Sequence, residues 1–225
     1  MNSEEVIALV LPEVHAELAP TLTAIGEQST PPADVLVPRR AAGLAPGPPT
    51  IGSAGWIWLV EAGVVPRGDA LARLLEGAHR SPGRPVLVAG RVLSPSGQPD
   101  RGALPIPAVA DPDLTVEAFD RRLLSLRACP SGSFIVERPT FDRFGLPSGG
   151  GLEWTGRVLR DGPGFLEPAS VALRAPLQDR YERARTHAGL RDWARLLAGD
   201  ALDRREKPWF AFRLAEQATQ ALPRS

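Results

Sequence analysis

One segment in the first half of the chain constrains the fold more than any other. Residues 56–60 form an apolar run, Trp-Ile-Trp-Leu-Val, which Glu61 ends, and leucines follow at Leu71, Leu74 and Leu75. A continuous apolar run is typical of a strand covered on both faces, and the leucine spacing places those side chains on one face of a helix. The segment therefore predicts a buried strand, a turn and an amphipathic helix.

Strand and helix patterns alternate through this half of the chain. Apolar runs predict strands and apolar spacings of three and four predict a helix, and they fall at the following places: strands at 6–11, 34–38 and 85–93, and a helix at 14–27. A strand followed by a helix and another strand is typical of parallel crossover units. We therefore predict an α/β fold on a mostly parallel sheet, with helices on both faces.

The second half of the chain is less regular. A glycine-rich loop at 149–151 opens into a predicted helix, and apolar runs predict three more strands: 122–129, 133–137 and 165–173. The tail at 178–222 is rich in arginine and helical in pattern. We expect one domain over residues 1–176 and a helical extension over residues 177–225 that packs on this domain or on a partner.

Composition excludes several classes of protein. The 225 residues are 43% apolar and can bury a sizeable core, while 26 basic residues balance 26 acidic ones and give no electrostatic reason to expect nucleic acid as a partner. No apolar run approaches the roughly 20 residues of a membrane span. Cys129 is the only cysteine, so we expect it to pack in the core in a reducing compartment. We predict a cytoplasmic protein, with peripheral attachment to a membrane left open.

Four stretches in this order carry a resemblance to a known family. The first is the strand at 6–12 together with the segment at 28–37 that leads into the second strand, and the second is the strand and turn at 58–66. The third is a strand that ends in a Ser-Pro-Ser-Gly turn, at 90–97, and the fourth is a helix that starts with Gly-Leu-Glu-Trp, at 151–160. Together they resemble family 2 glycosyltransferases of the GT-A fold, especially the actinobacterial branch related to galactofuranosyl and rhamnosyl transferases. The resemblance implies a GT-A-like sheet and transfer of a sugar from a nucleotide-activated donor to a hydroxyl acceptor.

The resemblance implies a nucleotide site that is altered in this chain. Members of the family follow the second strand with an aspartate that helps to hold the base, whereas here Pro38 is followed by Arg39 and Arg40. Guanidinium groups suit phosphate oxygens, so these two arginines are candidate diphosphate ligands, with a solvated loop as the alternative. By the same resemblance, Pro12 and Glu13, next to the first strand, are candidate substrate-binding residues.

The metal site of the family has also lost most of its carboxylates in this chain. The resemblance implies a run of aspartates after the third strand that binds a divalent cation, but only Glu61 stands there. Because hard cations want several oxygen ligands, we predict no resident metal, and we expect magnesium or manganese only together with a nucleotide diphosphate. The alternatives for Glu61 are a ligand-binding carboxylate and a solvated turn residue.

The third altered site is the catalytic one. The family carries an acidic pair just before the late helix, and here those positions are Gly150 and Gly151, which leaves Glu153 as the nearest candidate general base. The alternative for Glu153 is an acid that complements the helix dipole and pairs with Arg157. Arg157 and Trp154 are candidate substrate-binding residues, and core packing is the alternative for Trp154.

Two classes of function remain open at this stage. The first is a divergent transferase that binds a nucleotide-sugar donor, with arginines in place of the cation. The second is a catalytically inactive transferase-fold protein that serves as a binding or scaffold partner. Aromatic and leucine residues in the tail predict helix faces that pack on the sheet, on a second copy of the chain or on a partner glycosyltransferase: Trp193, Leu196, Trp209 and Phe210.

Overall fold

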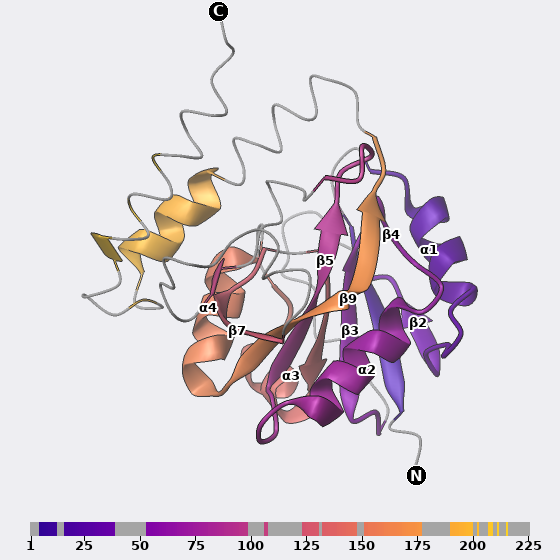
Figure 1. The fold of residues 1–225 in the computed structure, drawn as a ribbon, viewed down its shortest axis with the longest axis horizontal. Coiled ribbons are helices and arrows are strands. Elements are labelled where there is room, and N and C mark those ends of the chain that lie inside the picture. The colour runs from indigo at the N-terminus through magenta and orange to yellow at the C-terminus, as the bar shows by residue number, and fades with distance from the viewer. Residues whose placement is uncertain are drawn as a thin grey trace, which may run out of the picture.

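The structure is a computed structural model (Figure 1). It describes residues 5–12, 16–38, 53–98, 106–107, 123–130, 132–147, 151–176 and 190–199, together with residues 202, 207, 208, 211 and 215. Three predicted substrate-binding residues, Glu13, Arg39 and Arg40, lie outside this set.

The described residues form nine strands and four labelled helices, and the tail adds a helical segment and the helical residues 207, 208, 211 and 215. The strands are β1 (Val6–Leu11), β2 (Asp34–Leu36), β3 (Trp56–Glu61), β4 (Val64–Pro66), β5 (Leu87–Leu93), β6 (Ile106–Pro107), β7 (Leu124–Ala128), β8 (Ser133–Glu137) and β9 (Gly164–Arg174). The helices are α1 (Leu18–Gly26), α2 (Ala70–Arg80), α3 (Arg138–Phe144) and α4 (Leu152–Asp161). The helical segment in the tail covers residues 190–198.

The strands make one mixed sheet in the order β2-β1-β3-β8-β5-β9-β7-β6, with β4 paired to β9 outside this path. Parallel pairing joins β1 to β2, β1 to β3 and β5 to β9, and the other pairings among the described strands are antiparallel. The expectation of a mostly parallel sheet is corrected here. Apolar runs predict that strands are buried but carry no information on direction, and β8 runs antiparallel to both of its neighbours, β3 and β5.

The central strands are buried on both faces, as their apolar runs predicted. Along β3, Trp58 packs in one core cluster with Leu71 of α2, whereas Leu59 packs in a second cluster with Phe141 of α3. Successive side chains of a strand point to opposite faces, so the two clusters are the two sides of the sheet. Helices α1 and α2 cover one side, and α3 and α4 cover the other (Figure 1).

A glutamine ties the end of α1 to the start of α2. The Gln28 side-chain amide donates to the carbonyls of Ala24 and Arg67, and its oxygen accepts from the Leu71 N–H at 3.0 Å. The first N–H groups of a helix have no partner within the helix, so Gln28 acts as a cap for α2 from outside its own sequence neighbourhood. The two helices are therefore fixed together on one side of the sheet.

Three elements were absent from the sequence-based prediction: α3, β4 and the two-residue strand β6. Helix α3 is seven residues long, and its buried residues are Thr140 and Phe141. Two adjacent buried residues do not give the spacing of three and four by which a helix is recognised in a sequence. Strand β4 is three residues long and pairs antiparallel with the end of β9. In the part of the chain that the structure describes, no helix combines the length and apolar character needed to cross a bilayer.

The tail segment packs on the main body of the fold. Trp193, Leu196 and Leu202 form a buried cluster with Ala128 of β7 and Leu152 of α4. Figure 1 shows this helical segment beside α4 and β7. The described part of the helical extension therefore contacts the sheet and a helix of this chain.

Candidate functional site

The candidate site lies where β1 and β3 end. These strands are parallel, and their register pairs Leu11 with Glu61, so Pro12 and Glu61 stand at the same edge of the sheet. Ligands of open α/β sheets bind outside the carboxyl ends of the strands. This edge therefore unites two of the predicted substrate-binding residues.

A tight turn follows Glu61 and sends the chain back into β4. Gly63 has a φ of 80°, which glycine adopts without strain, and its N–H donates to the Thr21 hydroxyl of α1 at 3.0 Å. An ideal Cβ on Gly63 would lie 3.0 Å from the Ala16 Cβ. The turn is thus packed closely against the start of α1, which leaves little room beside it.

Glu61 forms an ion pair with an arginine that is distant in the sequence. Arg174, the last residue of β9, reaches this edge because β9 pairs with β4 in a register that sets Arg174 against Val64. Its Nη2 donates to Glu61 Oε2 at 3.2 Å, and the side chains are 5% and 10% exposed, respectively. A charge removed from water needs a partner, and each of these side chains supplies the counter-charge of the other. Of the two alternatives for Glu61, the structure excludes the solvated turn residue.

The described residues at this edge do not fit a divalent cation. A hard cation takes about six oxygen ligands, several of them from carboxylates. No group of three or more His, Cys, Asp and Glu side chains is close enough to hold a metal ion within the described ranges. Glu61, the carboxylate at the end of β3, already binds Arg174.

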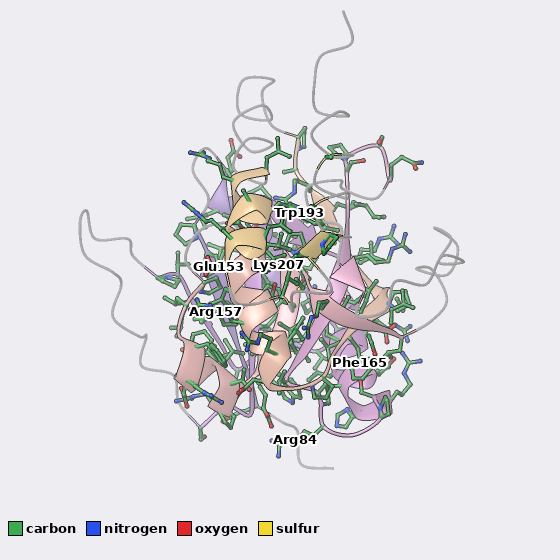
Figure 2. The ribbon with its side chains drawn as sticks, turned by 90° about the vertical axis from the view of Figure 1, so that its left-hand side faces the viewer. Arg84, Glu153, Arg157, Phe165, Trp193 and Lys207 are labelled. Atoms are coloured by element: carbon green, nitrogen blue, oxygen red, sulfur yellow. The ribbon has the colours of Figure 1, made fainter. Side chains whose placement is uncertain are left out.

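The second predicted cluster lies on α4. Glu153 stands in the first turn of the helix, and its Oε1 is 3.9 Å from Arg157 Nε, four residues on. The Glu153 side chain is 38% exposed and that of Arg157 is 48% exposed. Figure 2 labels both residues. An acid in the first turn complements the helix dipole, so this geometry fits the pairing alternative and also leaves the carboxylate accessible.

Trp154 points away from solvent. It is 1% exposed, its indole N–H donates to the Phe144 carbonyl at 3.3 Å, and its ring centroid is 6.0 Å from that of Phe134. Stacking on a sugar or a base needs an accessible face, which this ring lacks. The structure therefore favours the core-packing alternative for Trp154.

Cys129 is buried, as the sequence predicted, and lies next to α4. Its N–H donates to the Thr155 hydroxyl, which in turn donates to the Cys129 carbonyl. Burial raises the pKa of the Cys129 thiol to about 12, and the hydrogen bond from Thr155 lowers it by less. The thiol is therefore protonated at neutral pH and is not a nucleophile.

Two residues of this region escaped the sequence analysis. Arg174 stands at the end of an apolar strand. An arginine there can be exposed or can form a buried ion pair, and the sequence does not distinguish the two unless the partner is known. Asp192 belongs to the tail, yet its Oδ2 accepts from the N–H of Leu152, the first residue of α4, at 3.2 Å. These contacts span 113 and 40 residues, so local sequence patterns do not reveal them.

Comparisons with known proteins place the fold. No protein-family model matches the sequence, and no curated protein matches it either. Among solved structures, GalNAc-T7 with UDP, GalNAc and Mn²⁺ superposes with a TM-score of 0.56 at 13% identity and covers 99% of this chain. S. aureus TarS 1–349 with UDP-GlcNAc superposes with a TM-score of 0.51 at 9% identity and covers 95% of this chain.

The aligned proteins are longer than this one. The chain spans about half of the GalNAc-T7 chain, 52%, and 72% of the TarS chain. At these identities the likeness concerns the fold. The chain has the GT-A fold that the sequence resemblance implied, built on a mixed sheet.

Proposed function

We propose that this protein binds a nucleotide-activated sugar at the carboxyl edge of β1 and β3 and transfers the sugar to a hydroxyl acceptor. One observation carries the proposal: two solved structures that hold UDP or a UDP-sugar superpose on 99% and 95% of this chain. The sequence resemblance supports a family 2 transferase related to the actinobacterial galactofuranosyl and rhamnosyl enzymes. The nucleotide-sugar donor is accordingly the proposed small-molecule partner.

The proposed donor site works without a resident cation. The GalNAc-T7 structure contains Mn²⁺, but in this chain the carboxylate at the end of β3, Glu61, is held by Arg174. Arg39 and Arg40 follow the second strand and are the proposed ligands of the diphosphate, because guanidinium forks match phosphate oxygens. Magnesium or manganese would enter only together with the nucleotide diphosphate, whose oxygens would supply most of its ligands.

Glu153 is the proposed general base. It would accept the proton of the acceptor hydroxyl while that oxygen attacks the anomeric carbon, the bond to the nucleoside diphosphate breaks and the anomeric configuration inverts. Its position in the first turn of α4 and its partial exposure support this role. Arg157, which lies beside it, is a proposed contact to the substrate.

The experiment is a ligand titration followed by thermal stability. Uridine, guanosine and thymidine diphosphates and their sugars are added with Mn²⁺ or with EDTA, and a ligand at one hundred times its Kd should stabilise the fold by about 2.7 kcal/mol. We expect stabilisation in EDTA by at least one of these nucleotide sugars, and its loss in Arg39→Ala with Arg40→Ala. The control is Arg73→Ala, which removes an exposed arginine on α2.

A second candidate function is an inactive transferase-fold partner protein. A specific observation favours it: both candidate acids are engaged, Glu61 by Arg174 and Glu153 by Arg157. A homo-oligomer or a partner glycosyltransferase, bound through the C-terminal helices, would then be the binding partner. No stabilisation by any nucleotide or nucleotide sugar would favour this function over transfer. The cytoplasm, or the cytoplasmic surface of a membrane, remains the predicted location in either case.

A further inference from the structure

The start of α4 has no cap of its own. Gly151 precedes the helix with a φ of 82° and has no side chain to offer, so the first N–H groups of the helix need partners from elsewhere. The N–H of Leu152 finds one in Asp192 Oδ2 at 3.2 Å, in a buried contact. A residue 40 positions further along the chain therefore supplies the acceptor that a helix usually takes from its own N-cap.

Asp192 is buried at this position. It is 4% exposed, and its second oxygen, Oδ1, lies 3.7 Å from Arg195 Nη1, on the same helical segment. The next residue, Trp193, is buried with Leu196 against Leu152. Figure 2 shows Trp193 beyond the end of α4 that carries Glu153. The apolar contacts of the tail thus place the Asp192 carboxylate next to the start of α4.

The place that Asp192 reaches is the end of α4 that carries the proposed site. The first turn of α4 holds Glu153, and Arg157 follows one turn later. A carboxylate at a helix N-terminus is favourable because it faces the positive end of the helix dipole. Glu153 already brings one carboxylate to this end, and Gly151 has no side chain to add another, so the tail supplies the second.

We propose that Asp192 is a positioning residue: by binding the Leu152 N–H it fixes the first turn of α4, and with it the direction of the Glu153 carboxylate. The part concerning Glu153 rests on the proposed function. Asp192 itself is buried and bound to the backbone, so it acts through α4 and touches no substrate. The tail segment is on this view a component of the site.

Amide hydrogen exchange of the full chain tests the contact. Asp192→Ala should speed exchange at Leu152 and in the first turn of α4 by about fivefold or more, the effect of losing one helix cap. Asp192→Asn keeps the shape and one acceptor oxygen, so it should give a smaller change and serves if the alanine variant does not fold. The control is Asp142→Asn, which breaks an exposed pair with Arg138 on α3 and should leave exchange in α4 unchanged. Unchanged exchange at Leu152 in both Asp192 variants would overturn the proposal.

Kinetics test the link to the site. With a nucleotide sugar that the wild type uses, Asp192→Asn should lower kcat severalfold and leave the KM of the donor unchanged, since the donor binds at the edge of β1 and β3. Asp142→Asn should change neither. An unchanged kcat despite faster exchange at Leu152 would refute the effect on Glu153. If the wild type binds no nucleotide sugar, the proposed function fails, while the exchange experiment still decides whether Asp192 holds α4.

Discussion

Arg174 Nη2 lies 3.2 Å from Glu61 Oε2, in a contact that joins the end of β9 to the end of β3. Both side chains are almost inaccessible, so the Glu61 carboxylate depends on Arg174 for its counter-charge. The same contact occupies the carboxylate that a cation at this edge would need. Stability and ligand chemistry are therefore linked at one pair of residues.

Removing one member of this pair should be costly. Arg174→Met leaves the Glu61 carboxylate buried without a partner, and we expect a loss of about 3–5 kcal/mol in the free energy of unfolding, measured by urea denaturation. The double variant Glu61→Gln with Arg174→Met buries no charge and should lose less than the single variant. The matched control is Arg157→Met, whose exposed pair with Glu153 should contribute at most about 1 kcal/mol. A loss in Arg174→Met as small as that in the control would contradict the buried pair.

Trp154 should behave as a core residue. Trp154→Ala removes a ring that is 1% exposed, and we expect a loss of about 3–5 kcal/mol in urea denaturation. Trp154→Phe keeps an aromatic ring and loses the hydrogen bond to the Phe144 carbonyl, so it should cost less. Nucleotide affinity, expressed per folded molecule, should be the same in Trp154→Phe and wild type. A large drop in affinity with little loss of stability would instead indicate a stacking role.

The Cys129 thiol should make stability depend on pH in the alkaline range. Its pKa is raised from an ordinary value of 9.0 to about 12 by burial. The neutral thiol is thus favoured in the folded state, and its contribution is complete below pH 9 and is lost as the pH rises from 9 towards 12. The wild-type free energy of unfolding should fall relative to that of Cys129→Ala by about 1.4 kcal/mol per pH unit in this window. A constant difference between pH 8 and pH 10.5 would contradict the burial.

Two helical glycines should respond in opposite ways to alanine. An ideal Cβ on Gly77 of α2 would lie 3.0 Å from the Glu167 Cβ, and Glu167 is held by Arg80 and by the Ala169 N–H. Crowding of this kind lowers the free energy of unfolding by about 1–3 kcal/mol. Replacing a helical glycine by alanine raises it by roughly 1 kcal/mol. The crowding should outweigh this gain, so Gly77→Ala should lower Tm. Gly26 is the last residue of α1, and an ideal Cβ built on it would have no other atom within 4 Å, so Gly26→Ala should leave Tm unchanged or raise it. Equal responses at the two positions would contradict the contact with Glu167.

The strands and helices could be predicted from the sequence where the pattern is local. The apolar run at 56–60 lies in β3. Of the leucines that follow it, Leu71 and Leu74 lie on the buried face of α2. The direction of β8 could not be predicted, because an apolar run reads the same in either direction. Helix α3 buries too few residues to leave a period.

The candidate site was less predictable than the fold. Glu61 was identified as the carboxylate that follows the third strand, but its partner Arg174 lies 113 residues away. Such a pairing depends on the register of β4 with β9, which no local pattern encodes. Asp192 escaped for the same reason, since its contact with Leu152 depends on how the tail packs. The roles of Pro12, Glu13, Arg39, Arg40 and Glu153 stay predictions.

The cluster formed by Ala128, Leu152, Trp193, Leu196 and Leu202 has a consequence for biosynthesis. During translation, β7 and α4 leave the ribosome well before the tail does. Until the tail arrives, Ala128 and Leu152 lack the aromatic and leucine side chains that cover them, and exposed apolar surface of this kind favours aggregation. Nascent chains halted before residue 190 should therefore depend more on chaperones than the finished protein does.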